Sequence, residues 1–335
     1  MTIRTSLVMP LFNGSLTVER AIRSVLSQDR GDWELLVVDD CSTDDSRDVV
    51  SALAAEDSRG RVRLILQERN GGPSAARNAG VAAASGEFIG FLDCDDELLP
   101  GYLSTMEANI SDDVDIVVAA HIAQTPTGRR SPRPDAAQGL LTGLQAVDAA
   151  LQGKLWNFLH AKVYRRSLFR SFSFPQDLVR YEDLVLNSIA YSYSRKVRIV
   201  SQPVYVYHVQ AQSLTWSQEP SMQFVQGTLE HIRAGLNPEV ASQVKQRSWN
   251  TLRTFLGVLT ISGGLFAGSP KPSVDRIVRY VREELSFRVL ADAAVAAPHI
   301  GLSGMLIKVV PGLYARLYRW HVRRTFDMGA EKHES

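Results

Sequence analysis

Residues 34–53 read ELLVVDDCSTDDSRDVVSAL, and this stretch predicts one strand followed by one helix. The apolar, β-branched run from Glu34 to Val38 is typical of a buried strand. Residues of the types found in a capping box follow from Ser42 to Asp45, and the apolar residues behind them recur at helical spacing: Val49, Val50 and Leu53. A strand, a polar turn and an amphipathic helix in this order form half of a βαβ unit.

The same alternation runs through the first 120 residues. Further strands are predicted at Thr5–Met9, Arg63–Leu66, Phe88–Leu92 and Asp115–Ala119. One helix should contain Val18 to Leu26, and another should open at Pro73, run to Ser85 and stop at Gly86, because proline suits a helix start and glycine its end. The pattern predicts the α/β fold class, with a parallel sheet covered by helices.

The remaining chain has a different organisation. Residues Thr125 to Gly139 are rich in proline, glycine and arginine, which predicts an exposed connection or insertion. Lys196 to Val209 predicts a strand pair broken at Pro203, and from about Glu219 the pattern is mainly helical. We therefore expect a sheet-containing part over residues 1–215 and a helical region over residues 216–335.

Composition bounds the class of protein. The chain has 335 residues, of which 45% are hydrophobic and 22% charged, and its mean hydropathy is −0.09. These averages exclude a disordered, fibrous or polytopic membrane protein. Two cysteines, Cys41 and Cys94, and the lack of a recognisable leader predict reduced thiols and a cytoplasmic location.

Charge is divided unevenly along the chain. Residues 1–125 carry 10 Lys and Arg against 21 Asp and Glu, whereas residues 126–335 carry 27 against 15. No lysine precedes Lys154, so the acidic part is a poor nucleic-acid binder, and we expect no nucleic-acid partner. The basic part could still face an anionic surface.

The C-terminal segment has the composition of an interfacial helix. No acidic residue occurs between residues 293 and 326, and basic side chains alternate there with apolar and aromatic ones: Lys308, Leu313, Tyr314, Arg316, Leu317, Tyr318, Arg319, Trp320, Arg323 and Arg324. Such a helix can lie on an anionic membrane surface. The same pattern also fits a helix docked on its own domain. The uncharged stretches 254–270 and 293–307 are too short to span a bilayer.

Polar residues follow directly on the predicted strands. They include Pro10 with Asn13, then Asp39-Asp40, and then the run from Asp93 to Asp96. A single carboxylate in such a place is commonly a cap or turn residue. Five carboxylates at the end of one sheet, where ligands bind, indicate a cation, and oxygen ligands suit Mg²⁺ or Mn²⁺.

Five of these segments together resemble the bacterial family 2 glycosyltransferases with the GT-A fold. The segments are VMPLFN (8–13), VVDDCSTDDS (37–46), NGGPSAARNAG (70–80), FLDCDD (91–96) and RYED (180–183). They occur in the order and at the spacings of that family, and the resemblance covers residues 1–215. Residues 216–335 match nothing specific.

The resemblance implies a nucleotide site. Pro10 and Phe12, with Asn13 in the same loop, would frame the base, and Asp39 would accept a hydrogen bond from the base edge. Gly72 would let the backbone approach the nucleotide. Asp40 closes the same turn as Asp39 and is expected to be structural.

The resemblance also implies a metal site and an acidic cluster. Asp93 would meet the ribose, and Asp95 would bind Mn²⁺ or Mg²⁺ on the diphosphate. His208 stands where some related enzymes place a metal-binding histidine, although a packed, hydrogen-bonded histidine fits the same pattern. Arg77 would lie near the ribose or the acidic cluster, or it could be an ordinary ion-pair partner.

The RYED segment carries the implied catalytic pair. Asp183 would be the general base, Glu182 would orient the acceptor, and Trp156 would contact the acceptor sugar through its aromatic face. The same two carboxylates could also simply offset the dipole of the helix that starts there.

The sequence thus predicts an inverting, metal-dependent glycosyltransferase. It would move a sugar from a nucleotide diphosphate donor, most simply a UDP-sugar, to a hydroxyl of a saccharide or lipid-linked acceptor. This activity fits the synthesis of a cell-surface polysaccharide, a glycolipid or a teichoic-type polymer. It also fits a location at the inner face of the cell membrane.

Two other function classes were weighed. A sugar nucleotidyltransferase should have a glycine-rich, basic loop after the first strand, but PLFNGS (10–15) has no Lys or Arg before Arg20. A receiver-like interaction module is suggested by LLVVDD (35–40) and does not account for RYED.

Overall fold

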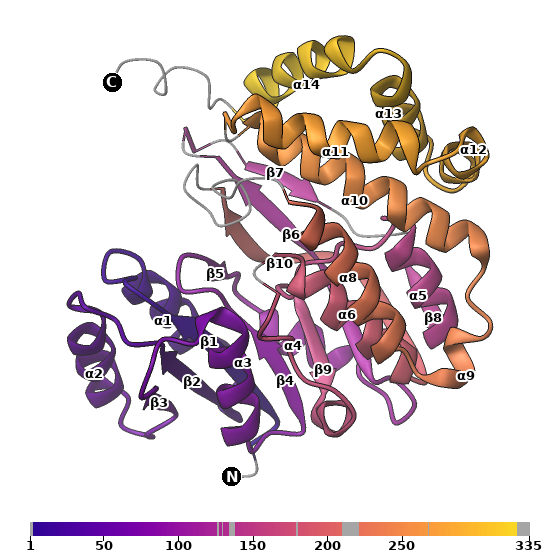
Figure 1. The fold of residues 1–335 in the computed structure, drawn as a ribbon. Coiled ribbons are helices and arrows are strands. Elements are labelled where there is room, and N and C mark those ends of the chain that lie inside the picture. The colour runs from indigo at the N-terminus through magenta and orange to yellow at the C-terminus, as the bar shows by residue number, and fades with distance from the viewer. Residues whose placement is uncertain are drawn as a thin grey trace.

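The computed structural model describes residues 3–125, 127–128, 130–133, 138–178, 180–209, 221–266 and 268–326. Their ten strands form one sheet (Figure 1). The strands are β1 (Thr5–Leu11), β2 (Trp33–Asp39), β3 (Val62–Leu66), β4 (Phe88–Phe91), β5 (Glu97–Leu98), β6 (Ile116–Gln124), β7 (Arg130–Arg133), β8 (Gly139–Thr142), β9 (Lys162–Arg165) and β10 (Lys196–His208).

The strand order places a crevice at the carboxyl end of β1. The order is β3-β2-β1-β4-β9-β6-β10-β5, with β7 on β6 and β8 on β10. Strands β1 to β4 are parallel, and β1 has β2 on one side and β4 on the other. The chain therefore reverses its direction of travel across the sheet at β1, which is where ligands bind in open α/β sheets.

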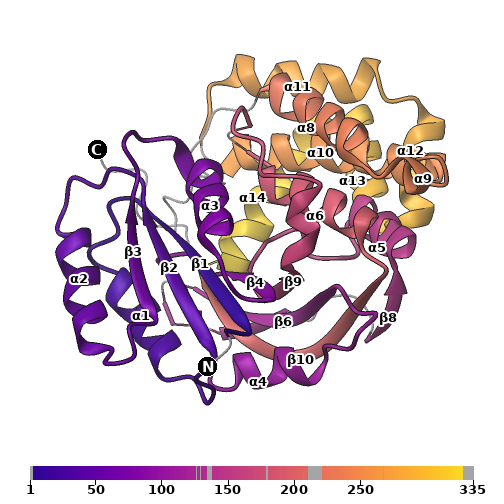
Figure 2. The same cartoon turned by 90° about the horizontal axis from the view of Figure 1, so that it is seen from below.

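Helices cover both faces of this sheet, as Figure 2 shows from below. One face is covered by α1 (Val18–Leu26), α2 (Ser46–Glu56) and α4 (Tyr102–Ala108). The other is covered by α3 (Gly72–Ala83), α5 (Gly143–Leu151) and α6 (Glu182–Tyr193). Alternation along β1 feeds both cores, because Leu7 and Met9 belong to the first and Val8 to the second.

The C-terminal helices form a compact group beside the sheet (Figure 1). They are α8 (Met222–Gly235), α9 (Pro238–Ala241), α10 (Gln246–Phe266), α11 (Lys271–Glu283), α12 (Phe287–Ala296), α13 (Pro298–Val309) and α14 (Pro311–Phe326). Helix α10 joins two cores, since Leu252 and Leu256 pack with the sheet and Ile261 packs with α11 to α14. Among the described helices, none has the length and apolar character needed to cross a bilayer.

The mixed α/β class and the helical C-terminal region are confirmed, and two local predictions, the strand pair at Pro203 and the capping box, are wrong. Lys196–His208 is one strand, because a register shift at Pro203 absorbs the missing N–H while pairing with β6 continues. The connection after β6 contains strand β7. Helix α2 starts at Ser46 without a side-chain cap, so the capping box is absent.

The predicted boundary between residues 215 and 216, and Glu219 as the helical start, lie outside the described residues.

Candidate functional site

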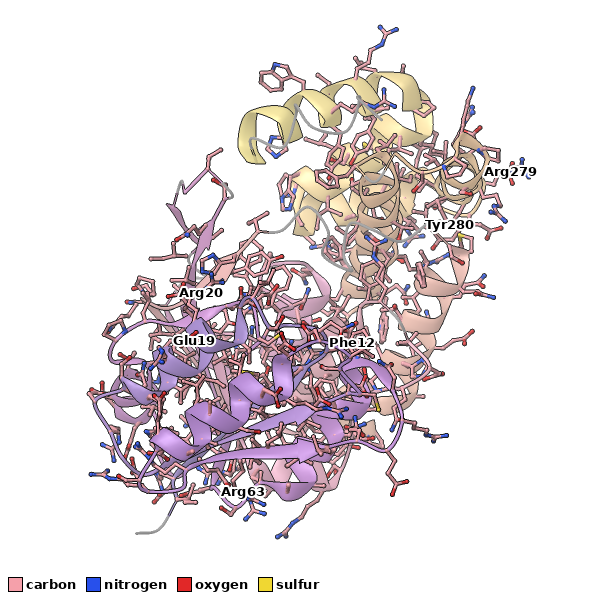
Figure 3. The ribbon with its side chains drawn as sticks, turned by 90° about the vertical axis from the view of Figure 1, so that its left-hand side faces the viewer. Phe12, Glu19, Arg20, Arg63, Arg279 and Tyr280 are labelled. Carbon is pink, nitrogen blue, oxygen red and sulfur yellow. The ribbon has the colours of Figure 1, made fainter. Side chains whose placement is uncertain are left out.

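The residues predicted to bind the nucleotide gather at the carboxyl ends of β1 and β2. Pro10 pairs with Val38 and Leu11 with Asp39, so the two strands end side by side. Phe12 follows β1 and is 50% exposed, which is unusual for a phenylalanine between two buried cores. Figure 3 labels Phe12 on this part of the molecule. Its ring is available to a planar ligand.

The loop after β1 is bonded to the loop after β2. Asn13 lies at φ 50° and donates its backbone N–H to Ser42 Oγ at 2.9 Å. The Asn13 side-chain oxygen accepts from the Thr43 N–H at 2.8 Å. The N–H groups of Gly14 and Ser15 also donate to side chains of that loop. Asn13 therefore shapes the loop after β1, and the N–H groups of Asn13, Gly14 and Ser15 already have partners within the protein.

Asp39 is fully buried at the end of β2. Its carboxylate accepts from Arg47 Nε at 2.7 Å and from the Ser42 N–H at 3.2 Å. A base edge arriving here would thus meet the Asp39–Arg47 pair, and Arg47 is a contact that sequence reasoning did not single out.

Asp40 fixes the glycine turn before α3. Its two carboxylate oxygens accept from the backbone N–H groups of Gly71 at 2.8 Å and Gly72 at 2.7 Å, as a structural residue would. Gly72 has φ +79°, a conformation that favours glycine. A Cβ at Gly72 would meet no atom within 4 Å, so open space lies beside this backbone.

Arg77 joins three motifs that are far apart in the sequence. Its Nη2 lies 3.1 Å from Asp93 Oδ1, and its Nη1 lies 3.3 Å from Glu182 Oε1 and 3.6 Å from Asp183 Oδ1. The Arg77 side chain is only 7% exposed. Arg77 is therefore an ion-pair partner, as the alternative held, but a buried one whose single positive charge offsets part of the negative charge of the acidic cluster.

Asp183 has an unused acceptor oxygen. Within the described residues, Asp183 Oδ1 is buried and accepts no hydrogen bond. Burial raises the pKa of Asp183 to about 7, helped by the charges of Glu182 and Asp93 and opposed by Arg77. A carboxylate with this pKa and a vacant lone pair can take a proton near neutral pH. It lies in the first turn of α6, so the dipole-compensating role is also fulfilled.

The carboxylates of Asp93, Asp95 and Asp96, which follow β4, have different surroundings. Asp93 is 37% exposed. Burial and the Asp93 charge raise the pKa of Asp95 to about 6, so a cation would be favoured beside them. Asp96 instead accepts from the Tyr205 hydroxyl and the His208 N–H, both at 2.8 Å, which ties the segment to β10.

The side chains around Asp95 provide only some of the ligands that a hard cation needs. His208 Nε2 lies 2.7 Å from Glu97 Oε1, an acidic neighbour that the predicted ligand set did not contain. Across the residues that the structure describes, no three histidine, cysteine or acidic side chains converge as a ready metal site. The carboxylates of Asp93 and Asp95 are the oxygen type that Mg²⁺ and Mn²⁺ prefer, and such ions usually take further oxygens from a phosphate.

Trp156 belongs to an aromatic stack next to β10. Its ring stacks on Phe158 with centroids 5.8 Å apart and meets His121 edge-on at 5.3 Å. Two polar residues that the sequence analysis missed hold this loop. Lys162, which is 1% exposed, donates to the Trp156 and Phe158 carbonyls, and Asn187 of α6 donates to the Phe158 carbonyl. The sequence signal that could have identified Lys162 is a lysine next to the apolar residues of a strand.

Arg180 is a second buried arginine beside the RYED pair. It is 4% exposed, and none of its three guanidinium nitrogens has a hydrogen-bond partner among the described residues. Its guanidinium lies 5.0 Å from the centre of the Tyr181 ring and fits against Gly263 of α10. The cation–π contact offsets part of the burial cost.

Comparisons with known proteins agree with this geometry. The family described as "Glycosyl transferase family 2" matches residues 6–172. The chain is 30% identical to EpsH of Bacillus subtilis over 219 residues, which cover 64% of this chain and 63% of that protein. It is 31% identical to the uncharacterized glycosyltransferase alr2836 of Nostoc sp. over 234 residues, covering 66% of this chain and 71% of that protein.

A solved structure shows the same fold. Staphylococcus aureus TarS residues 1–349, in complex with UDP-GlcNAc, superimpose with a TM-score of 0.68 at 19% identity, covering 96% of this chain and 92% of that chain. The shared fold includes the C-terminal helices, since almost the whole chain is covered. The sequence matches show that the chain belongs to glycosyl transferase family 2, and the shared fold agrees with that membership.

Proposed function

We propose that the protein transfers a sugar from a nucleotide diphosphate donor, in the first instance a UDP-sugar, to a hydroxyl of a saccharide or lipid-linked acceptor. The observation that carries the proposal is the Arg77 cluster. Asp93, assigned to the donor, and Asp183, assigned to the acceptor, both lie within 3.6 Å of the same guanidinium. One arginine thus holds the carboxylate assigned to the donor next to the carboxylate assigned to the acceptor.

The proposed chemistry is a single displacement. Asp183 Oδ1 accepts the proton of the acceptor hydroxyl as the oxygen attacks the anomeric carbon. The new glycosidic C–O bond forms while the bond to the diphosphate breaks, and its electron pair leaves with the diphosphate. Asp183 Oδ1 is buried and, within the described residues, accepts no hydrogen bond, which suits the base of a single displacement with inversion at the anomeric carbon.

Glu182, Trp156 and Arg77 would position the substrates. Glu182 Oε1 shares Arg77 Nη1 with the base and is 18% exposed, so it can still accept from a sugar hydroxyl. The partly exposed Trp156 ring offers a flat face to the acceptor sugar. Pro10 and Phe12 frame the base, Asp39 reaches its edge together with Arg47, and Gly72 leaves room for the nucleotide.

A divalent cation, Mn²⁺ or Mg²⁺, is proposed on Asp95 with His208 as a second ligand and the donor diphosphate as a third. When bound, it would neutralise the charge of the departing diphosphate. The raised pKa of Asp95 supports the proposal, because burial and repulsion from Asp93 both disfavour the ionised carboxylate, and a cation would offset both. His208 would exchange its contact with Glu97 for the metal.

Donor binding tests the proposal. Thermal unfolding should be followed with a panel of nucleotide diphosphates and their sugars, each with and without Mn²⁺. We expect one nucleotide to raise the midpoint in a metal-dependent manner. Asp95→Asn should lose the metal-dependent part, while Asp45→Asn, an exposed carboxylate in the loop before α2, should keep it. A folded protein that responds to no nucleotide would overturn the proposal.

The same proposal includes a location for the protein, the inner face of the cell membrane. Helix α14 exposes Leu313, Leu317 and Trp320 by 44%, 49% and 60%, and Arg316 and Arg319 lie between them. Tyr314 of the same helix is buried and bonds Ser262, so α14 is also docked on its own domain.

A triple substitution of Leu313, Leu317 and Trp320 by serine tests membrane contact without disturbing Tyr314. We expect it to lose recovery with vesicles of phosphatidylglycerol, and neither protein should bind neutral vesicles. Equal recovery of the wild-type and triple-variant proteins would remove the membrane from the proposal.

A further inference from the structure

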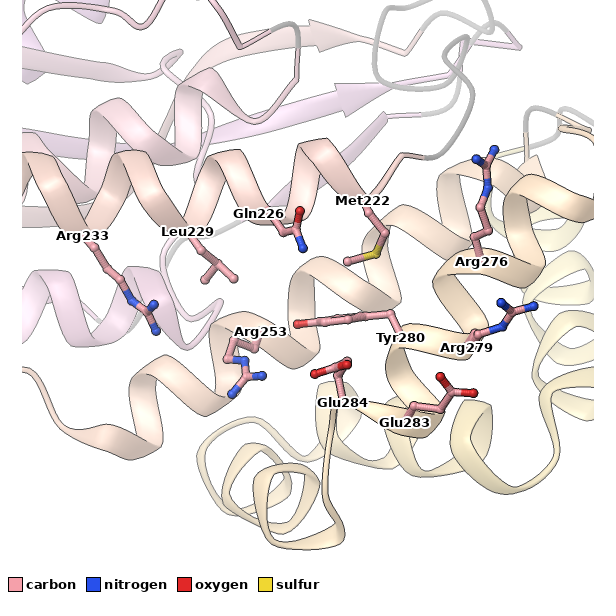
Figure 4. Close-up of a pocket in the computed structure, with 10 residues that line it drawn as sticks. All are labelled: Met222, Gln226, Leu229, Arg233, Arg253, Arg276, Arg279, Tyr280, Glu283 and Glu284. Carbon is pink, nitrogen blue, oxygen red and sulfur yellow. The ribbon is translucent and has the colours of Figure 1, made fainter.

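A second cavity lies outside the strand-end site. It is formed by α8, α10 and α11 and encloses about 570 Å³ (Figure 4). Figure 3 places Arg279 and Tyr280 of this cavity among the C-terminal helices, well apart from Phe12. The volume is in the range of sites for small ligands. Residues 216–335, whose role the sequence left open, therefore contain a candidate binding site of their own.

The cavity is dominated by arginine. Four arginines from three helices line it, against two glutamates: Arg233, Arg253, Arg276, Arg279, Glu283 and Glu284. Within the described part of the chain, none of the four guanidiniums lies within 4.0 Å of a carboxylate oxygen. This lining keeps a positive excess that no ion pair cancels.

Most of the hydrogen-bonding capacity of these arginines is unused. Within the described residues, Arg276 Nη2 donates to the Ser273 hydroxyl at 3.3 Å, Arg253 is hydrogen-bonded to Tyr280, and Arg233 lies over the Trp249 ring at 5.1 Å. Each guanidinium has five N–H donors in a planar fork, which matches phosphate and carboxylate oxygens. Arginines of this kind at a cavity are suited to an oxyanion.

The rest of the lining is apolar and aromatic. Met222, Leu229 and Tyr280 face the cavity between the arginines (Figure 4). Burial raises the pKa of Tyr280, a hydrogen bond from Arg253 and the charges of Arg253 and Arg233 oppose that rise, and the charge of Glu284 adds to it. An aromatic face next to cationic forks suits a sugar ring that carries an oxyanion.

We propose that this cavity binds an oxyanion-bearing saccharide, as the extended part of the acceptor. The inference rests on the proposed function, in which the phosphates of the donor are bound at the strand ends. A second, cationic site is then left for the acceptor. The acceptor class becomes an acidic glycan whose charge is a phosphate or a carboxylate.

Calorimetric titrations without divalent metal, in EDTA, test the proposal. The probes are inorganic pyrophosphate, a trisaccharide of glucuronic acid and a neutral glucose trisaccharide. The wild-type protein is compared with Arg276→Met/Arg279→Met. The matched control is Arg282→Met/Arg288→Met, two exposed arginines outside the cavity, which remove the same charge.

We expect an anionic probe to bind the wild-type protein and the control within twofold of each other, and the cavity variant at least about tenfold more weakly. Binding of pyrophosphate alone identifies a phosphate, and binding of the glucuronate alone a carboxylate. Equal weakening in both variants, equal binding of the neutral trisaccharide, or no binding of either anion would overturn the proposal.

The donor experiment separates the two proposals. The nucleotide-dependent rise in the unfolding midpoint should be the same in the wild-type protein and in both double variants. Failure of that rise in all three proteins would contradict the proposed transferase, whereas loss of oxyanion binding alone contradicts only the cavity assignment.

Discussion

Arginine has different surroundings in the two parts of the molecule. Arg77 of α3 is 7% exposed and contacts three carboxylates, whereas Arg276 and Arg279 of α11 are exposed and, within the described residues, contact none. The first arginine is part of the framework, because it holds acidic groups together that would otherwise repel one another. Arg276 and Arg279 instead keep N–H donors that a ligand can use. Charge alone therefore does not reveal the role of an arginine, but its partners do.

Removing Arg77 should give the largest effect among the predictions on this contrast. Arg77→Met leaves the Glu182, Asp183 and Asp93 carboxylates without their buried cation. We expect a loss of about 3 kcal/mol in the free energy of unfolding, at the low end for a broken buried pair because Asp183 can bind a proton instead. Urea unfolding at pH 7 measures this loss. A change below about 1 kcal/mol would contradict the framework role.

The pH dependence of transfer should give the next largest effect. The folded pKa of Asp183 is raised to about 7, so the fraction of ionised base falls as pH drops below that value. We expect the transfer rate to fall about 50-fold between pH 7 and pH 5. Since Arg77 lowers the pKa of Asp183, Arg77→Gln should move the midpoint to higher pH. A profile that is flat from pH 5 to 7 would show that the base is another group.

Asp40 should have an intermediate effect through the glycine turn. Asp40→Asn puts an amide NH₂ group opposite one of two backbone N–H donors, so one of these donors loses its acceptor. We expect a loss of about 1–3 kcal/mol in the free energy of unfolding and weaker donor binding. Asp45→Asn, exposed nearby, should change stability by less than about 0.5 kcal/mol. Equal behaviour of the two variants would mean that Asp40 does not hold the turn.

An exposed arginine of the acidic half should give the smallest effect. Arg63 Nη1 lies 3.2 Å from Glu34 Oε2, but the Arg63 side chain is 51% exposed. We expect Arg63→Met to cost at most about 1 kcal/mol and to leave the transfer rate unchanged. A loss as large as that of Arg77→Met would show that burial does not explain the difference between the two arginines.

The sequence predicts the parallel half of the fold well. Strands β1 to β4 and helix α1 follow from local apolar patterns, and α3 follows from the proline near its start. Strands β5, β8 and β9 are two to four residues long and were not predicted. Their pairing partners are distant in the chain, so no local pattern encodes them. The strand break predicted at Pro203 is wrong because a bulge can accommodate a proline inside a strand.

The sequence motifs predict the residues of the site but not the contacts between those residues. Asp93, Glu182 and Asp183 were singled out from their segments, yet nothing in the sequence showed that Arg77 contacts all three. Arg47 on Asp39, Glu97 on His208 and the buried Lys162 were missed for the same reason. Each pairs a residue with another that only the fold brings close. The four arginines of the second cavity come from three helices and share no motif.

The most direct measurement of the central claim is transfer by Asp183→Asn alongside donor binding by the same preparation. Asparagine keeps the shape of the side chain but cannot take the proton. We predict that transfer falls by about 10²- to 10⁴-fold while the affinity for the nucleotide donor stays within about threefold. Transfer at the wild-type rate would contradict the assignment of Asp183 as the base, and a parallel loss of donor binding would show that Asp183 supports the site instead of performing the chemistry.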